Sequence, residues 1–257
     1  MSHCVHFASD LHLGAPNTAA SHARERRFVA WLRDAAEGRG FAQGAKATEI
    51  HVVGDLFDFW FEYRRAVPKG GVRVLGALAE LTDAGLPVHF HAGNHDMWTM
   101  GYLSEELGVQ VHKEPIRCIW DGVECLVGHG DGLGPGDARY KRIKRVFQSN
   151  LCQQAFRWVH PDLGIALAHA WSAHSRRRGE LPVGDMALEH LVQYAESLKA
   201  SKDGQDIDVF VFGHRHAPID TPIAGGQARY LNLGDWITHH TSVCLQGGEA
   251  RLIHHQI

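Results

Sequence analysis

The stretch EIHVVGDLFD, residues 49–58, carries the pattern that decides the fold. Its first five residues are mostly apolar and β-branched, which predicts a buried strand over Glu49–Val53. Gly54 permits a tight turn, and two carboxylates follow it. The same order, an apolar run and then side chains able to bind metal, occurs in four other places. They are FASDLH (7–12), AGNHD (92–96), VGHGD (127–131) and FGHRH (212–216).

Strands and helices alternate through the first half of the chain. The residue patterns predict further strands over His3–Ala8, Pro87–His91 and Glu124–Val127, with helices over Ala23–Glu37 and Val72–Ala84. Strands that alternate with helices are joined by crossover connections, so part of the sheet is expected to be parallel.

The C-terminal part has a different pattern. A predicted helix, Asp185–Lys199, precedes a strand at Asp208–Phe212, and Gly225-Gly226 and Gly247-Gly248 then indicate hairpins, as Asp121-Gly122 does earlier. We therefore predict an α/β (α+β) fold in which two mixed sheets pack face to face with helices outside. No repeat or linker divides the chain, so one domain is expected over residues 1–257, including a helical insertion at 137–184.

The insertion is strongly basic. Residues 139–178 contain nine Lys and Arg against one acid, Asp162, a net of +8 in a chain whose total is −3. Basic amphipathic helices with aromatic residues are typical of membrane surfaces or of covers over anionic lipids; a solvated helical pair is the alternative. Nucleic acid is not expected, because no motif for it is present. Two apolar faces have helical spacing: Tyr140, Ile143 and Phe147, and then Leu163, Leu167 and Trp171.

The cysteines and the hydropathy limit the class of protein. Five scattered cysteines without a C-x-x-C pair argue against a disulfide scaffold or a zinc ribbon. No apolar run approaches the roughly 20 residues that span a bilayer, and no leader segment is evident. The sequence predicts a reduced, cytoplasmic protein.

Seven side chains in the five motifs are suited to a pair of divalent cations. A lone His or Asp at a strand end is usually a cap or a core hydrogen-bonding group, but five such segments in one chain favour a shared site. Asp55 is the expected bridge between the cations, because a metal pair needs a shared anionic ligand. Carboxylate, amide and imidazole donors without thiolate suit Mn²⁺, Fe or Zn²⁺, and Mn²⁺ is the expected metal. The first cation is assigned to Asp10, His12 and His216, and the second to Asn94, His129 and His214.

In order, the motifs D-x-H, G-D-x-x-D, G-N-H-D, G-H and G-H-x-H resemble the calcineurin-like metallophosphoesterase superfamily. The resemblance implies a four-layer fold, phosphoester hydrolysis and the ligand assignments above. For such a site we expect His95 to stabilise the phosphoryl group or protonate the leaving oxygen, with Asp96 orienting its ring. Asp58 and Asp131 are expected either to hold ligands by hydrogen bonds or to cap loops.

A closer resemblance rests on GDLFDFW (54–60), HGD (129–131), DARY (137–140) and the basic insertion. These are similar to the UDP-2,3-diacylglucosamine pyrophosphatases of lipid A synthesis, although the enterobacterial members carry Arg at the position of His95. The resemblance implies cleavage of UDP-2,3-diacylglucosamine to UMP and 2,3-diacylglucosamine 1-phosphate. From the basic insertion we also expect peripheral association with the anionic surface of the inner membrane. Implied substrate contacts are Trp60, Asn94, Asp137, Ser172 and His214.

Two other functions remain open at this point. A broader nucleotide-sugar pyrophosphatase or phosphodiesterase with the same metal site would hydrolyse soluble UDP-sugars without acyl chains. A metal-free binding scaffold is disfavoured, because such a protein normally lacks some ligands and all seven are present.

Overall fold

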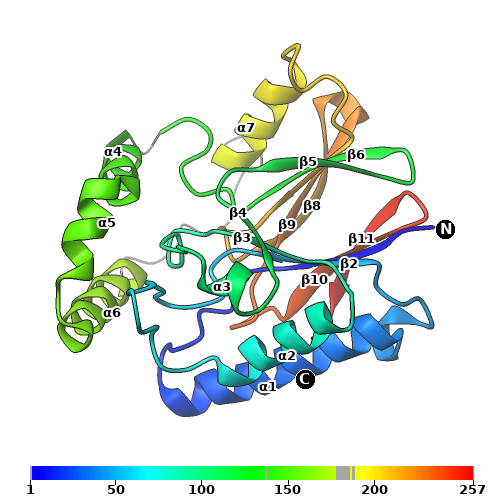
Figure 1. The fold of residues 1–257 in the computed structure, drawn as a ribbon. Helices are drawn as coiled ribbons and strands as arrows, with labels where there is room; N and C mark the ends of the chain where they lie inside the picture. Colours follow the sequence, from blue (N-terminus) through cyan, green and yellow to red (C-terminus); the bar gives the residue numbers. More distant parts are fainter. Residues whose placement is uncertain (1, 137, 178–185, 187–188, 257) are drawn as a thin grey trace.

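Two β-sheets packed face to face form the centre of the computed structural model, which describes residues 2–136, 138–177, 186 and 189–256 (Figure 1). The first sheet has the order β11-β10-β1-β2-β3-β4, and β1 to β4 are parallel. Its strands are β1 Cys4–Ala8, β2 Glu49–Val53, β3 Val88–His91, β4 Gln110–His112, β10 Thr241–Gln246 and β11 Glu249–His254.

The second sheet has the order β5-β6-β7-β9-β8. Its three central strands are parallel, and the two edge strands pair antiparallel with their neighbours. Both sheets are therefore mixed, as predicted. The strands are β5 Ile116–Trp120, β6 Val123–Gly128, β7 Val209–Phe212, β8 Pro218–Ile223 and β9 Ala228–Leu233.

Helices cover the outer face of each sheet (Figure 1). Helices α1 (Thr18–Glu37) and α2 (Val72–Asp83) lie against the first sheet, and α7 (His190–Lys199) lies against the second. Because successive strand residues point to opposite faces, Phe7 packs between the sheets while Ala8 packs under the helices. Val211 and Phe212 divide in the same way in the second sheet. The predicted four-layer fold is confirmed.

The predicted element boundaries agree closely with the structure. Strand β2 has the predicted bounds, and all three predicted hairpins join antiparallel strands. Helix α1 begins earlier than predicted because Asn17 caps it: its side-chain oxygen accepts a hydrogen bond from the Ala20 amide at 3.0 Å. Asp185, the predicted start of the next helix, lies outside the described residues, and α7 begins at His190 after Glu189. The short helix α3 (Tyr102–Glu105) was not predicted.

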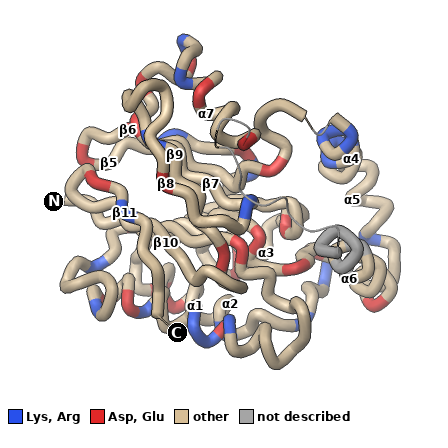
Figure 2. The backbone as a smooth tube through the Cα atoms, turned by 180° about the vertical axis from the view of Figure 1, so that it is seen from behind, with Lys and Arg blue, Asp and Glu red and all other residues tan. Residues whose placement is uncertain are grey.

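Three helices, α4 (Ala138–Gln148), α5 (Asn150–Arg157) and α6 (Pro161–Arg177), lie beside the strand ends and are termed the cap helices (Figure 1). Lys and Arg cluster on α4 (Figure 2). The indole of Trp98 donates a hydrogen bond to the Phe147 carbonyl at 2.8 Å, and Phe61 contacts Phe156 with ring centroids 4.6 Å apart. These contacts attach the cap helices to the core. The side chain of Trp171 is outside the described part of the chain.

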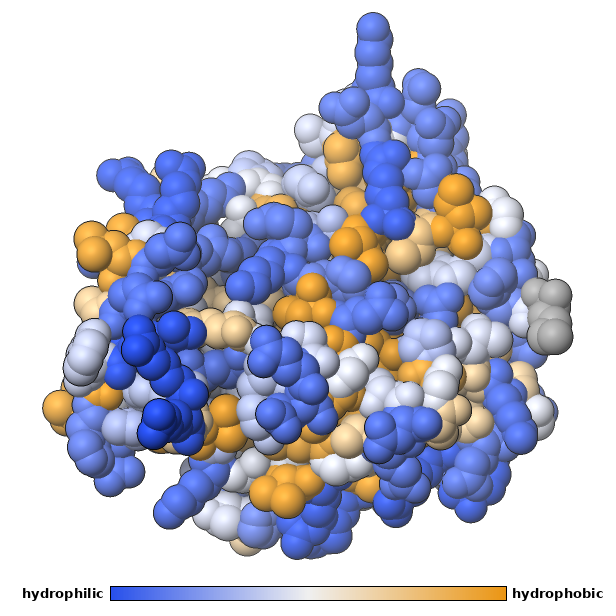
Figure 3. Space-filling model, viewed as in Figure 1, coloured by the Kyte–Doolittle hydropathy of each residue, from blue (hydrophilic) through white to orange (hydrophobic). Residues whose placement is uncertain are grey.

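Large apolar side chains of the cap helices are exposed to solvent. The exposed fraction is 82% for Leu151 and 85% for Trp158, and neither α4 nor α5 has a buried residue. Leu163 and Leu167 of the predicted second face are exposed as well. Figure 3 shows apolar side chains beside strongly hydrophilic ones on this side of the molecule. The cap helices therefore present a mixed apolar and basic surface.

Candidate metal centre

The five motifs follow strands whose carboxyl ends meet at one edge of the two sheets. Asp10, Asp55 and Asn94 come after β1, β2 and β3, while His129 and His214 come after β6 and β7. In sheets of this kind, ligands bind beyond the carboxyl ends of the parallel strands. The turns remain paired past the strands, since the His12 amide donates to the Asp55 carbonyl at 2.9 Å. The sheet order therefore brings the distant motifs together.

Several of these side chains stand on unusual backbone. The φ angles of Asp10, His12, Asp55, His214 and His216 are 56°, 45°, 51°, 71° and 48°. Left-handed backbone costs a residue with a Cβ roughly 1–2 kcal/mol, and such strain is concentrated at functional sites. Gly93 leaves room for the Asp55 carboxylate, because a Cβ at this position would overlap that carboxylate. The turns are thus shaped to direct side chains inward.

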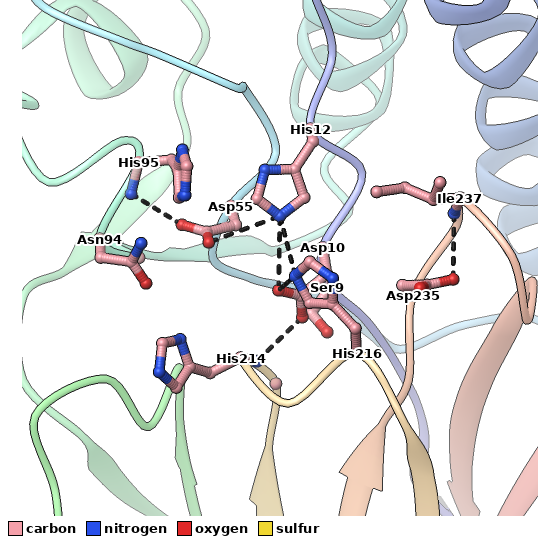
Figure 4. Close-up of polar contacts among 12 residues, drawn as sticks. Ser9, Asp10, His12, Asp55, Asn94, His95, His214, His216, Asp235 and Ile237 are labelled. Atoms are coloured by element: carbon pink, nitrogen blue, oxygen red, sulfur yellow. Dashed lines mark hydrogen bonds and ion pairs between the residues drawn. The ribbon is translucent and has the colours of Figure 1, made fainter. Parts of the chain in front are cut away.

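One group of donors gathers Asp10, His12 and His216 beside Asp55 (Figure 4). Asp10 Oδ1 lies 3.2 Å from His216 Nε2, and the Nε2 atoms of His12 and His216 are 3.0 Å apart. Asp10 Oδ1 is buried and accepts no hydrogen bond from the described residues. A buried carboxylate oxygen facing two imidazole nitrogens is a suitable position for a cation.

A second group gathers Asp55, His129 and His214, with Asn94 beside it. Asp55 Oδ2 lies 3.4 Å from His129 Nε2 and 3.6 Å from His12 Nε2, so this one carboxylate adjoins both groups. Asn94 Oδ1 is 3.3 Å from His129 Nε2. His129 Nδ1 lies 2.9 Å from the Val53 carbonyl, and donation there leaves Nε2 free to bind a metal.

The electrostatics of the two groups also suit a cation pair. Burial raises the pKa of a carboxyl group, but the imidazole of His216 holds the pKa of Asp10 well below its usual range. Burial likewise opposes charge on His129, yet the Asp55 carboxylate raises the pKa of this imidazole to about 10. Burial and the neighbouring His129 lower the pKa of His214 to about 4. Buried carboxylates stay ionised only when positive charge lies close to them, and the donor groups fit a dinuclear metal site.

The sequence profile described as "Calcineurin-like phosphoesterase" matches residues 5–218. The chain belongs to this family. A UDP-2,3-diacylglucosamine hydrolase of Porphyromonas gingivalis is 37% identical to this phosphoesterase, over 95% of this chain and 94% of that protein. A hydrolase of the same name from Stenotrophomonas maltophilia is 30% identical and covers 90% of both chains. Among solved structures, a phosphoesterase from E. coli is 16% identical, with 94% of this chain and 87% of that one covered and a TM-score of 0.45.

His95 lies beside the donor groups of this phosphoesterase, at the end of the β3 turn (Figure 4). Its backbone amide donates to Asp55 Oδ1 at 2.9 Å, and its ring is 4.6 Å from that of His12. The ring Nδ1 is 2.8 Å from the Asp58 carbonyl oxygen and 3.5 Å from the Ser172 hydroxyl. Because a carbonyl oxygen only accepts hydrogen bonds, Nδ1 donates to it, and this bond fixes the tautomer of the ring.

The predicted pairing of Asp96 with the His95 ring is wrong. The Asp96 carboxylate instead accepts hydrogen bonds from the backbone amides of Gly93 at 2.8 Å and Leu56 at 2.7 Å. Burial and the negative charge of Asp55 raise the pKa of Asp96 to about 7, against the effect of the Gly93 amide. Asp96 therefore ties the turn after β2 to the turn after β3, which positions Asp55. The sequence could not show this, because the partners of Asp96 are backbone groups.

The predicted substrate contacts have different placements. Trp60 is only 1% exposed, stacks on Phe57 in the core and donates its indole N–H to Glu62, and its contact with a substrate stays a prediction. Ser172 is buried, and its hydroxyl donates to Asp58 Oδ1 at 2.9 Å. Asp137 lies outside the described residues. Asn94 and His214 are within the second donor group.

Asp58 and Asp131 connect the site to the cap helices. Asp58 meets Ser172 of α6, and its Oδ1 is 3.8 Å from His12 Nδ1. Asp131 Oδ2 accepts a hydrogen bond from the Tyr140 hydroxyl at 2.7 Å and pairs with Lys144 at 2.7 Å. This anchoring role of Tyr140 and Lys144 was not predicted, because the helical spacing of Tyr140 assigns it to an apolar face. None of the described helices has an apolar stretch able to cross a bilayer.

Proposed function

We propose that this phosphoesterase hydrolyses the pyrophosphate bond of UDP-2,3-diacylglucosamine, giving UMP and 2,3-diacylglucosamine 1-phosphate. The relatives that cover nearly the whole chain carry the name of this activity, and the one from P. gingivalis is 37% identical. The structural observation that supports the chemistry is the Asp55 carboxylate, which adjoins both donor groups within 3.6 Å. The reaction adds one water across the P–O–P bridge.

The seven donor residues would hold the two divalent cations. Asp10, His12 and His216 would bind one and Asn94, His129 and His214 the other, with Asp55 shared. When bound, such a pair makes water more acidic and neutralises charge on the phosphoryl oxygens. The donors are oxygen and nitrogen only, which suits Mn²⁺, with Fe or Zn²⁺ as alternatives.

His95 is the proposed acid or electrostatic group. With Nδ1 held by the Asp58 carbonyl, Nε2 is the nitrogen that meets the substrate, and its protonated form donates to a phosphoryl or leaving oxygen. Asp96 contributes by holding the Gly93 and Leu56 amides, and through them the Asp55 and Asn94 turns. Trp60, Asn94, Asp137, Ser172 and His214 remain the proposed substrate contacts.

The cap helices are proposed to receive the acyl chains and to meet the anionic inner-membrane surface. Leu151 on α5 and Trp158, which directly follows α5, are exposed apolar side chains, and Lys and Arg cluster on the preceding helix α4 (Figure 2). A polybasic segment contributes about 1 kcal/mol per Lys or Arg near such a surface. Sedimentation with vesicles tests this: binding should require anionic lipid, and equal sedimentation with neutral vesicles would refute the membrane proposal.

A hydrolysis assay with Mn²⁺ tests the substrate. UDP-2,3-diacylglucosamine should be cleaved far faster than UDP-N-acetylglucosamine at equal concentration, with UMP as a product. The second candidate, a broader nucleotide-sugar pyrophosphatase, has the same metal donors and predicts the opposite preference. Faster turnover of the unacylated compound would therefore replace the first proposal with the second.

A further inference from the structure

A second group of metal-competent side chains lies at the other end of β1, on the face that the helices cover. Cys4 and His6 belong to β1, and Cys244 belongs to β10. His6 pairs directly with Cys244 in the antiparallel ladder, and Cys4 lies two residues before His6 on the same face. Cys4 and Cys244 are 240 residues apart in the sequence, and the pairing of these strands alone brings them together.

The distances in this group approach those of a tetrahedral metal site. Cys4 Sγ is 3.4 Å from His6 Nε2 and 4.0 Å from Cys244 Sγ, and Cys244 Sγ is 4.0 Å from His6 Nε2. Zinc bonds of about 2.3 Å to sulfur and about 2.0 Å to nitrogen give edges of about 3.8 Å between sulfurs and about 3.5 Å between sulfur and nitrogen. The carbonyl oxygen of Ala45 is 4.0 Å from Cys4 Sγ, on the fourth side.

The surroundings hold the group in place. His6 is fully buried, and its ring stands at right angles to Trp31 and Phe41, with centroids 6.3 Å and 5.4 Å away. Thiolate is the form of cysteine that binds metals.

We propose that Cys4, His6 and Cys244 bind one thiophilic d¹⁰ cation. Zn²⁺ is the expected ion, and Cu⁺, which prefers the same ligands, is the alternative. The Ala45 carbonyl or a water would take the fourth position. This site is separate from the phosphoesterase centre, since Cys4 and His6 lie within β1 whereas Asp10 lies beyond the carboxyl end of that strand. It also differs in chemistry, because thiolates select soft ions while the phosphoesterase donors are oxygen and nitrogen.

Cobalt substitution tests this site without reference to activity. Full-length protein, kept reduced with a phosphine and saturated with Co²⁺, should show a near-ultraviolet thiolate-to-cobalt charge-transfer band. The phosphoesterase donors include no sulfur and cannot produce this band, so its presence is independent of the proposed reaction. Zinc content by elemental analysis should fall by one equivalent per chain in Cys4→Ser and Cys244→Ser.

The variants decide between a metal and a hydrogen-bonded group. Cys4→Ser and Cys244→Ser should each lose the band and keep full phosphodiester turnover, whereas Cys118→Ser, a cysteine outside the group, should keep both. If Cys4→Ser fails to fold, Cys244→Ser, which is only half-buried, provides the test. No band in the wild type, a band that survives in Cys244→Ser, or a Cys4–Cys244 disulfide under reducing conditions would overturn the proposal.

Discussion

The metal centre and the cap helices differ in how their side chains are held. Asp10 is fully buried and Asp55 is 1% exposed, each fixed by neighbouring turns, whereas Leu151 and Trp158 are more than 80% exposed. The centre contains carboxylates and imidazoles, while the segment around the cap helices has a net charge of +8. Under the proposed function, bond cleavage depends on the strand ends, and the choice of an acylated substrate depends on the cap helices.

The largest effect is expected at the shared carboxylate. Asp55→Asn should lower turnover by about 10³-fold or more on UDP-2,3-diacylglucosamine and on a soluble phosphodiester alike, because both donor groups lose a ligand. Kinetics with both substrates, together with metal content, measure this. Asp83→Asn, at an exposed position on α2, is the control. Retained turnover in Asp55→Asn would contradict the proposed centre.

His95→Gln should be the next most damaging change. Loss of an acid or electrostatic group typically costs about 10²–10⁴-fold in rate. The fall should appear in kcat for both substrates, with metal content unchanged, because His95 is outside the two donor groups. Nearly full turnover with both metals bound would show that His95 has no role in bond cleavage.

Substitutions in the cap helices should affect hydrolysis of the acylated substrate only. Leu151→Ser combined with Trp158→Ser should weaken use of UDP-2,3-diacylglucosamine about tenfold, since fully burying one large apolar side chain contributes about 1.5–3 kcal/mol and an acyl chain covers each of these two only in part. Hydrolysis of bis-p-nitrophenyl phosphate should not change. Ile119→Ser removes another exposed apolar side chain, 67% exposed, from β5 and serves as the control. Equal losses on both substrates would remove the distinction between the two regions.

The smallest effect concerns stability and pH. Between the sheets, His51 Nδ1 is 3.0 Å from His91 Nε2, and burial together with neighbouring histidines holds both pKa values well below the usual range. The folded chain then binds fewer protons than the unfolded chain. The stability from these groups is complete above the unfolded pKa of about 6.5 and is lost as the pH falls below it.

The unfolding free energy of the wild type should therefore fall as the pH is lowered from 7.5 to 5. In His51→Phe this fall should be smaller by about 1–2 kcal/mol. Urea unfolding of both proteins after chelation measures the difference, so that loss of metal does not contribute. Identical pH dependence would show that His51 is not kept neutral by burial. Such a result would leave the comparison between the centre and the cap helices unaffected.

Much of the fold and of the centre could be predicted because local patterns carry it. The apolar run Glu49–Val53 followed by Gly54 and Asp55 predicts both a strand and the position of a ligand beyond it. The Gly pairs likewise allowed the hairpins to be predicted, since the geometry of these turns itself favours glycine. The pairing of Asp96 with backbone amides, the burial of Trp60 and the anchoring of α4 by Asp131 were not predictable, because each depends on partners distant in the chain.

The sequence by itself determined which residue types follow each strand, and hence an oxygen and nitrogen donor set, a mixed α/β fold and a basic helical segment. Only the tertiary structure decided which side chains meet. Cys4, His6 and Cys244 form a group because β1 pairs with β10 in one register, and no local pattern contains that register. Periodicity specifies which face a side chain takes, whereas contacts between distant segments follow from sheet order and from packing between layers.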